Sequence, residues 1–365
     1  MSQTAMSVTI QSISPLAAVG VDAVAPWAAA ALDSALALPS SAVPNASAEP
    51  APAPPAPPVA ASVDAARLAA AARQGGLAPL LADLAAALQI PNLPTDVRTA
   101  AAQVLSLQTP IDPPPTAADL RAALAGSGLL LEARLAAVGG QPPAGDLKTA
   151  LLRLTAALAA APDAAPADPS SQPSRPPGPP LPPPYRGGPL AAQAPVPPSL
   201  TPALPTDAAI HRLTHEATAA VARQVLLQLA SATGGPRHAG DAPCAQWLFE
   251  IPFQGGAVAQ FEIARDHTTA GHGHAEVDAQ PLWRARFSLN LPPMGPVHAS
   301  IAMSEGRARV TLWAETGDTH QRLAGQADDL ARALRADDLA AQVTVLPGAP
   351  GAAPPAAGRF LDRAT

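Results

Sequence analysis

The uneven distribution of bulky side chains constrains this chain more than any other feature of its sequence. Apart from Trp27, Tyr185 and Phe360, every aromatic residue lies between Trp247 and Trp313. The 365 residues include 47 prolines, and alanine supplies much of the apolar content. Proline removes backbone donors and alanine buries little surface, so a continuous core is not expected. The sequence therefore predicts a compact domain in the last third and a loosely built region before it.

Alternation of apolar and polar side chains predicts a run of strands in that last third. In residues 283–291, Phe287 and Leu289 alternate with polar residues, a two-residue period typical of a half-buried strand. Prolines and a glycine at 292–296 then favour a sharp reversal. The same period marks four other segments, which are 247–253, 257–264, 297–303 and 307–315. We expect an antiparallel meander.

A helix and a closing strand follow the meander. Apolar side chains recur at three- and four-residue spacing from Leu323 to Leu334, and Asp318 or Thr319 is placed to cap the helix. Two-residue alternation then resumes at residues 343–345, and a right-handed crossover follows if the flanking strands share a sheet. The expected fold class is α+β: a small antiparallel or mixed sheet with one packing helix, preceded by a long Pro/Ala-rich, largely disordered and weakly helical region.

Short helical patterns rich in Ala and Leu occupy much of the chain before this domain. Alanine favours helix but supplies little core, so marginal helices separated by stiff Pro segments are expected. They are predicted at 63–72, 77–88, 95–107, 116–138 and 145–160, with a longer helix at 206–231. Two leucine-rich pieces, 119–135 and 146–154, are amphipathic. They either form a hairpin that buries its own leucines or provide a docking site.

The longest low-complexity run, residues 162–205, is rich in proline. Polyproline II conformation is expected there, which would make the run a semi-rigid spacer. Its Pro-x-x-Pro spacings leave a second interpretation open, in which the protein is a cytoplasmic Pro-rich adaptor that binds SH3-like or other protein modules.

Charge and cysteine content argue against several classes of function. A net charge of −6 and a pI near 5.7 disfavour nucleic-acid and anionic-membrane partners, which select clustered Lys and Arg. The apolar stretch 16–38 is interrupted by Asp22, Pro26 and Asp33, so no membrane insertion is expected. Cys244 is the only cysteine, which precludes an intramolecular disulfide and is interpreted as a structural thiol. We expect a soluble monomer.

One cluster carries metal-ligand residue types in a setting that argues against a metal centre. Its members are Asp266, His267, His272, His274, Glu276 and Asp278. Gly271 and Gly273 lie among them, and a connection between strands holds preorganised ligands poorly. No phosphate-binding glycine pattern, nucleophile elbow or spaced Ser–His–Asp set occurs in the sequence. The sequence therefore predicts no catalytic residue, no cofactor and no metal; the alternative is a metal-dependent enzyme acting through His272 and His274.

Two features of the meander are open to two interpretations. Trp313 points away from Val310 and Leu312, so either a second layer covers it or a partner binds it. The turn at 292–297 is either structural alone or also a partner contact. The predicted partner-binding residues are Leu291, Pro292, Pro293, Met294, Gly295, Val297 and Trp313.

The order and spacing of these elements resemble the C-terminal domain of the flagellar hook-length control protein family. The resemblance rests on a Leu-x-Leu-Pro-x-x-Gly-x-Val pattern at 289–297, a Val-x-Leu-Trp-Ala strand at 310–314, the Leu-rich helix and the closing Val-x-Val strand. Met294 stands where leucine is expected, and Asp337-Asp338 stand where a helix-ending glycine is expected. The two leucine-rich pieces are similar to a block that precedes this domain in some family members.

The resemblance implies an exported molecular ruler. Its C-terminal domain would contact the cytoplasmic domain of the export gate's switch protein and change export specificity from hook to filament substrates. Hook cap and hook subunits are further implied partners. The implied location is the cytoplasm, followed by export through the flagellar type III apparatus to the hook. The alternative within related machinery is needle-length control in an injectisome.

Composition and resemblance together divide the chain into six expected parts. Several of them bury too little apolar surface to offset the chain entropy lost on ordering. The parts are a disordered export-signal and linker region at 1–62, helical segments at 63–160, a Pro-rich linker at 161–205, a leading helix at 206–235, the hook-length control-like domain at 247–347 and a disordered tail at 348–365.

Overall fold

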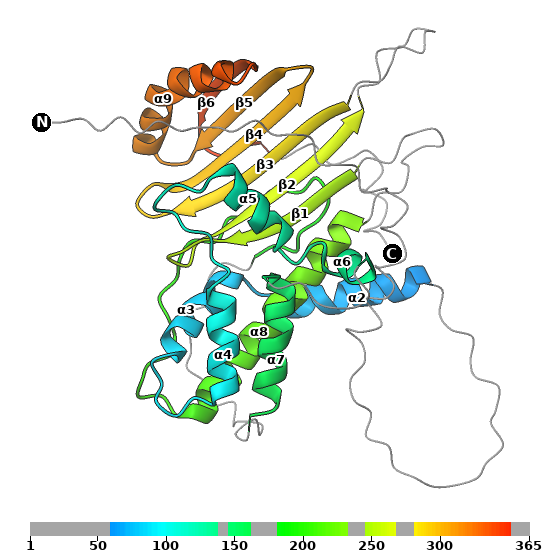
Figure 1. The fold of residues 1–365 in the computed structure, drawn as a ribbon, viewed down its shortest axis with the longest axis vertical. Helices are drawn as coiled ribbons and strands as arrows, with labels where there is room; N and C mark the ends of the chain where they lie inside the picture. The colour runs from blue at the N-terminus through cyan, green and yellow to red at the C-terminus, as the bar shows by residue number, and fades with distance from the viewer. Residues whose placement is uncertain (1–58, 138–144, 162–180, 233–244, 268–280, 352–365) are drawn as a thin grey trace, which may run out of the picture.

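A six-stranded sheet forms the centre of the structure. The computed structural model describes residues 59–137, 145–161, 181–232, 245–267 and 281–351 (Figure 1). The strands are β1 (Ala245–Pro252), β2 (Val258–His267), β3 (Pro281–Leu291), β4 (Gly295–Ser304), β5 (Arg307–Ala314) and β6 (Ala340–Pro347). They lie in chain order, and neighbouring pairs are antiparallel except β5 and β6, which are parallel. The expected α+β class, a mixed sheet with a packing helix, is confirmed.

The packing helix α9 (Gly317–Ala336) carries the chain from β5 to the parallel strand β6. Its leucines at 323, 330 and 334 are half-buried, while most of its charged side chains are exposed. On β6, Val343 and Val345 are half-buried, whereas Gln342 and Thr344 between and beside them are exposed. The helix therefore covers the face of the sheet that carries the valines.

Both ends of α9 differ from the expected caps. Neither Asp318 nor Thr319 is the N-cap; that position is Thr316, whose side chain makes no capping hydrogen bond. At the other end Asp338 takes the left-handed conformation, with φ of 60°, where a glycine was expected. Aspartate tolerates this region better than most residues, so the helix ends without glycine.

Several of the helices that precede the sheet pack together around α8. Their bounds are α2 (Val59–Arg73), α3 (Leu77–Ala87), α4 (Thr95–Leu105), α5 (Ala117–Ala125), α6 (Leu131–Ala137), α7 (Leu147–Ala159) and α8 (Thr206–Ala232). Leu80 and Leu84 of α3 and Leu151 of α7 are fully buried in one core with Ile210 and Leu213 of α8. The sequence predicts marginal, separate helices, whereas the structure joins them.

The core shared by these helices is stabilised by the sum of many small contributions. Each short helix has only a few leucines, but they fall on one side, and burying each contributes about 1.5–3 kcal/mol. Alanine at the neighbouring positions lets the helix backbones approach closely. The helix predicted at 116–138 is two helices, α5 and α6, because Gly126 and Gly128 separate them. Gly128 has φ of 88°, which most residues cannot adopt without strain.

Residues 181–205 of the Pro-rich run lie against the folded body rather than projecting as a spacer. Gln193 exchanges two backbone hydrogen bonds with Val258 of β2. The backbone N–H groups of Ser199 and Leu200 donate to the carboxylate of Asp83 on α3. The expectations for residues 1–58, 162–180 and 352–365 concern parts of the chain outside the described residues.

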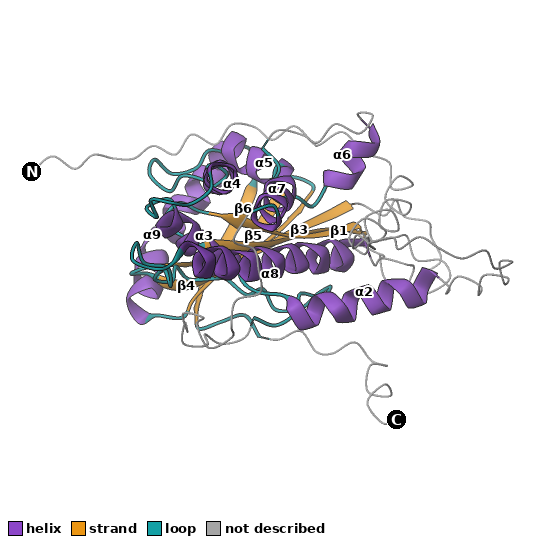
Figure 2. Ribbon diagram, turned by 90° about the horizontal axis from the view of Figure 1, so that it is seen from below, coloured by secondary structure: helices purple, strands orange, loops and turns teal. Residues whose placement is uncertain are grey.

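The sheet has an apolar face and a polar face. Phe249, Phe261 and Phe287 stack across β1, β2 and β3 on the apolar face, with successive ring centroids 5.4 Å apart. Leu124 of α5 packs over this stack, and α9 covers the same face at β5 and β6. Helix α8 packs on the polar face at β1 through contacts to Leu248. Figure 2 shows α5 and α8 on opposite sides of the sheet.

Candidate partner-binding surface

The turn between β3 and β4 is fixed by the first residues of α9. The carbonyl oxygen of Met294 accepts hydrogen bonds from the hydroxyls of Thr316, at 3.0 Å, and Thr319, at 2.7 Å. Gly295 has φ of 74°, and a β-carbon on it would lie 2.9 Å from the Cγ2 of Thr316. Pro292 and Pro293 at the tip are exposed. The turn therefore has a structural role, and its tip is free for contacts.

Trp313 lies on the polar face of the sheet. Its register partners are His298 on β4 and Leu346 on β6. The indole is half-buried, and Leu346 beside it is 39% exposed. Nε2 of His298 lies 3.0 Å from Oε1 of Glu315. Trp313 and Leu346 thus form an apolar pair on a face that α9 does not cover.

The seven predicted partner-binding residues fall in three places. Leu291 and Val297 are half-buried on the apolar face, Trp313 is on the polar face, and residues 292–295 form the turn at one end of the strands. The structure therefore does not bring all seven into one patch, and their role in binding stays a prediction. Leu346 was not predicted, although one signal existed: it breaks the alternation set by Val343 and Val345.

The polar sides of β5 and β6 together form a surface that we call the open face. It consists of Arg307, Arg309, Thr311, Trp313, Gln342, Thr344 and Leu346. The two arginines are exposed at one end, and the Trp313–Leu346 pair lies at the other. This arrangement of positive charge, hydroxyls and apolar surface suits a protein ligand with matching chemistry.

A buried ion pair anchors α8 to the sheet away from the open face. Nε of Arg223 lies 2.6 Å from Oε1 of Glu250 on β1, and both side chains are 1% exposed. The same carboxylate oxygen accepts from Nε2 of Gln193 at 3.1 Å, and Arg223 donates to Oε1 of Gln74 at 2.9 Å. These bonds join α8, β1, the residue after α2 and the Pro-rich segment in one network.

Lys148, the only lysine of the sequence, is buried at a second junction. Its Nζ contacts Glu132 of α6 and donates to Oε1 of Gln228 on α8 at 2.7 Å. Gln228 in turn donates to Oε2 of Glu132 at 2.7 Å. The leucine-rich pieces 119–135 and 146–154 are therefore part of the folded body: α5 packs on the sheet, and α7 packs in the helical core.

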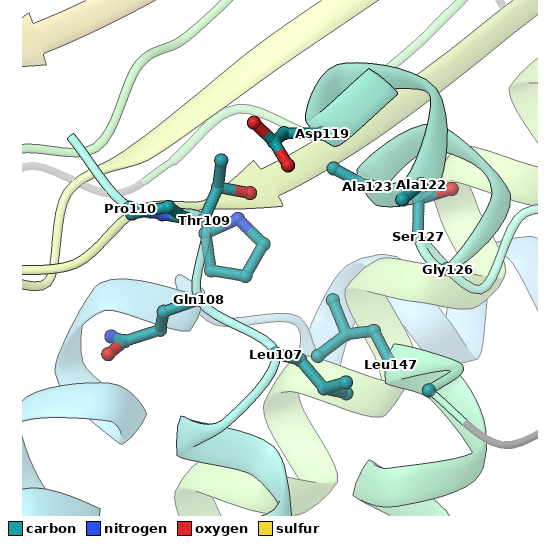
Figure 3. Close-up of a pocket in the computed structure, with 12 residues that line it drawn as sticks. Leu107, Gln108, Thr109, Pro110, Asp119, Ala122, Ala123, Gly126, Ser127 and Leu147 are labelled. Atoms are coloured by element: carbon teal, nitrogen blue, oxygen red, sulfur yellow. The ribbon is translucent and has the colours of Figure 1, made fainter. Parts of the chain in front are cut away.

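A small cavity of about 230 Å³ lies where α4, α5 and β1 meet (Figure 3). Two of its polar lining groups are already engaged. The carboxylate of Asp119 accepts from the backbone N–H and hydroxyl of Thr116, and the hydroxyl of Ser127 donates to the carbonyl of Leu124. The cavity therefore shows no convergent set of groups that would define a ligand.

Within the described residues, no group of three or more His, Cys, Asp or Glu side chains could hold a metal ion. The predicted cluster is only partly described: Asp266 and His267 end β2, while His272, His274, Glu276 and Asp278 lie outside the described residues. None of the described helices is long and apolar enough to cross a bilayer.

The C-terminal part of the chain is thus a mixed sheet with a crossover helix, and the open face lies on the side of the sheet opposite that helix. Residues 271–353 match the family model of the flagellar hook-length control protein FliK, so this part of the chain is similar to the C-terminal domain of that family. The resemblance in the sequence is confirmed; the family serves hook-length control and type III export and is not a family of enzymes. No curated protein and no solved structure matched the chain.

Proposed function

We propose that this protein is an exported flagellar hook-length control protein whose C-terminal domain, residues 247–347, switches export specificity from hook to filament substrates. The observation that carries the proposal is the family match over residues 271–353. This range contains β3 to β6 and α9, and therefore the whole of the open face. The part of the chain that matches the family is also the part that offers an uncovered surface.

The partner in this proposal is the cytoplasmic domain of the export gate's switch protein, bound at the open face. Trp313 and Leu346 supply the apolar centre of the contact, and the exposed Arg307 and Arg309 supply charge at its rim. Hook cap and hook subunits are met later, when the chain leaves the cytoplasm through the flagellar apparatus.

Length sensing has to be compatible with the packed helices. Residues before Val59 could extend about 200 Å at roughly 3.5 Å per residue, and the helical layer must unfold to add to this reach. Helix α2 is held to α8 largely by small side chains, with Ala70 against Ala222 and Leu226. Such contacts bury little apolar area, so this helix can be removed at low cost.

The deciding experiment is the hook-length distribution in a strain that lacks this gene. Hooks without a length limit are expected, because neither the ruler nor the switch would be present. Hooks of unchanged length would overturn the proposal. Detection of the protein in culture supernatant, and its loss in an export-deficient strain, separates an exported ruler from a cytoplasmic adaptor.

A further inference from the structure

Strand β6 is the last strand of the sheet, and one of its sides pairs with no described strand. The amides of Ala340 and Gly348 bond back to the β5 side of the sheet. Because successive residues of a strand alternate in direction, the backbone groups of the odd-numbered residues between them point outward. These residues are Ala341, Val343 and Val345. Within the described part of the chain, no backbone or side-chain group bonds to their outward N–H and C=O groups.

The opposite edge of the sheet is bonded to the helical layer at two positions. The hydroxyl of Ser231 at the end of α8 accepts from the backbone N–H of Leu248 at 2.8 Å. The carbonyl of Pro252 accepts from the backbone N–H of Thr109 at 2.8 Å, and Pro252 has no N–H to offer. The fold thus protects β1 against strand pairing and leaves β6 available.

β6 also lacks the sequence features that usually protect an edge strand. No charged residue occurs from Ala340 to Leu346, and the first proline, Pro347, comes at the end of the strand. Exposed edges of native sheets are commonly guarded by charges, prolines or bulges, because an unguarded edge pairs with other chains. Helix α9 packs against β6 on the face that carries Val343 and Val345.

The surroundings of the edge specify the side chains that an added strand should carry. Arg309 is exposed on β5 beside Gln342, near the start of β6. At the other end, Leu346 is 39% exposed beside Trp313. The direct neighbours of a strand added to β6 would be Gln342 and Leu346, since cross-strand neighbours on one face interact. An apolar side chain therefore suits the position beside Leu346, and a long acidic side chain beside Gln342 could reach across β6 toward Arg309 on β5.

We propose that β6 binds an extended segment of the export gate's cytoplasmic switch domain by strand addition. The outward groups of Ala341, Val343 and Val345 form the main-chain ladder with this segment, and the open face selects its side chains. The inference rests on the proposed function, because that function supplies the partner. It goes further by stating how the partner is bound.

The test uses the full chain and the purified cytoplasmic switch domain. Residue-resolved amide exchange of the free protein should show rapid exchange at the outward amides of Val343 and Val345 and slow exchange at Thr344 and Leu346. In the complex, the outward amides should become at least about tenfold slower, because they then donate in a ladder.

Two variants distinguish the role of the Val343 backbone N–H in binding from the role of its side chain. Val343→Pro removes an outward donor that no described group uses, and proline is tolerated at such an edge position. It should weaken binding at least about tenfold. Val343→Ala keeps the donor and should bind within about twofold of wild type. Slow exchange of the Thr344 amide in Val343→Pro verifies that β6 still pairs with β5. If that amide exchanges rapidly instead, the variant is set aside and the amide exchange of the wild-type complex decides the test.

The outcomes are distinct. Slowed outward amides together with weakened Val343→Pro binding support strand addition. Binding with unchanged outward amides overturns strand addition and leaves the proposed function intact. Absence of binding by the wild-type chain overturns both. A concentration-dependent dimer that Val343→Pro abolishes would show that a second copy occupies the edge, which also overturns the proposal.

Discussion

Thr319 donates its hydroxyl hydrogen to the carbonyl oxygen of Met294 over 2.7 Å, and this bond ties α9 to the β3–β4 turn. Thr316 donates to the same carbonyl at 3.0 Å. The shape of the turn therefore depends on the docking of the helix, although the two elements are separated in the sequence by two strands. Substitutions at the turn should act through the helix as well as locally.

Gly295→Ala should destabilise the protein by about 1–2 kcal/mol or more, because a β-carbon is disfavoured at φ of 74°. The added atom would also meet Thr316 Cγ2 at 2.9 Å. Urea unfolding of the full chain measures the effect. Gly325→Ala is the matched control: nothing lies within 4 Å of its added β-carbon, and alanine in a helix should stabilise by about 0.8–1 kcal/mol. Equal effects at both sites would contradict the role of the turn.

Arg223→Met should cost about 3–5 kcal/mol, because it leaves the buried carboxylate of Glu250 without its cation. The double variant Arg223→Met with Glu250→Leu should recover part of this loss. Chemical denaturation of both variants provides the measurement. As a control, Arg332→Met removes a pair with Asp329 in which both side chains are about two-thirds exposed, at 72% and 68%, and should cost about 0–1 kcal/mol. A double variant less stable than the single one would argue against the buried pair.

Burial raises the pKa of Asp146 above its ordinary value of 3.8, and the hydrogen bond from Thr149 opposes the shift. The folded state then binds the proton more tightly than the unfolded state, so stability falls as pH rises from 3.8 through the raised pKa. Asp146→Asn keeps an N-cap side chain and should be more stable than wild type at neutral pH. This advantage should vanish at low pH, as urea unfolding across a pH series would show.

Asp119 should give the opposite dependence of stability on pH. Hydrogen bonds from Thr116 lower the pKa of Asp119, so its contribution is present above the ordinary value of 3.8 and is lost as pH falls through the lowered pKa. Asp119→Asn should therefore be less stable than wild type at neutral pH and should approach it in acid. The same pH series measures both variants. If Asp146→Asn and Asp119→Asn changed the stability at neutral pH in the same direction, the opposite pKa shifts of the two carboxyl groups would be refuted.

Leu346→Asp should weaken binding of the export gate's switch domain about tenfold, equal to about 1.4 kcal/mol, because it places a charge in the apolar part of the open face. Isothermal titration calorimetry measures the affinity, and hook lengths in the variant strain report the switch. Leu68→Asp is the control, since Leu68 is 73% exposed on α2, far from this face in the sequence. Comparable losses in the two variants would indicate a non-specific effect.

The strands and α9 could be predicted because their patterns are local. In a strand such as β3, each side chain's environment follows from neighbours two residues away, and the pattern at 283–291 therefore located the strand closely. Leu346 could not be assigned in this way. The valines at 343 and 345 mark the covered face, whereas the exposure of Leu346 depends on what lies over the other face.

No local sequence pattern predicts how the helices before the sheet pack together. Gln193 accepts from the backbone N–H of Ala78, 115 residues away, and Arg223 donates to Gln74 across 149 residues. Neither glutamine belongs to a pattern that would mark it as buried, because glutamine is usually exposed. The core around α8 is likewise assembled from short helices that would each be marginal alone, so single-helix propensity understates its stability.

Helix α5, which comes early in the described chain, covers part of the sheet that comes near its end, whereas α2 packs on α8. If the protein is threaded from its N-terminus, tension reaches α2 first, and only later α5, which shields the phenylalanine stack. The order of the elements in the sequence would then set the order in which they unfold. A pulling force applied at residue 59 should release α2 before it unfolds the sheet. Helix α5 should detach between these two events, which would expose the phenylalanine stack shortly before its own strands unfold.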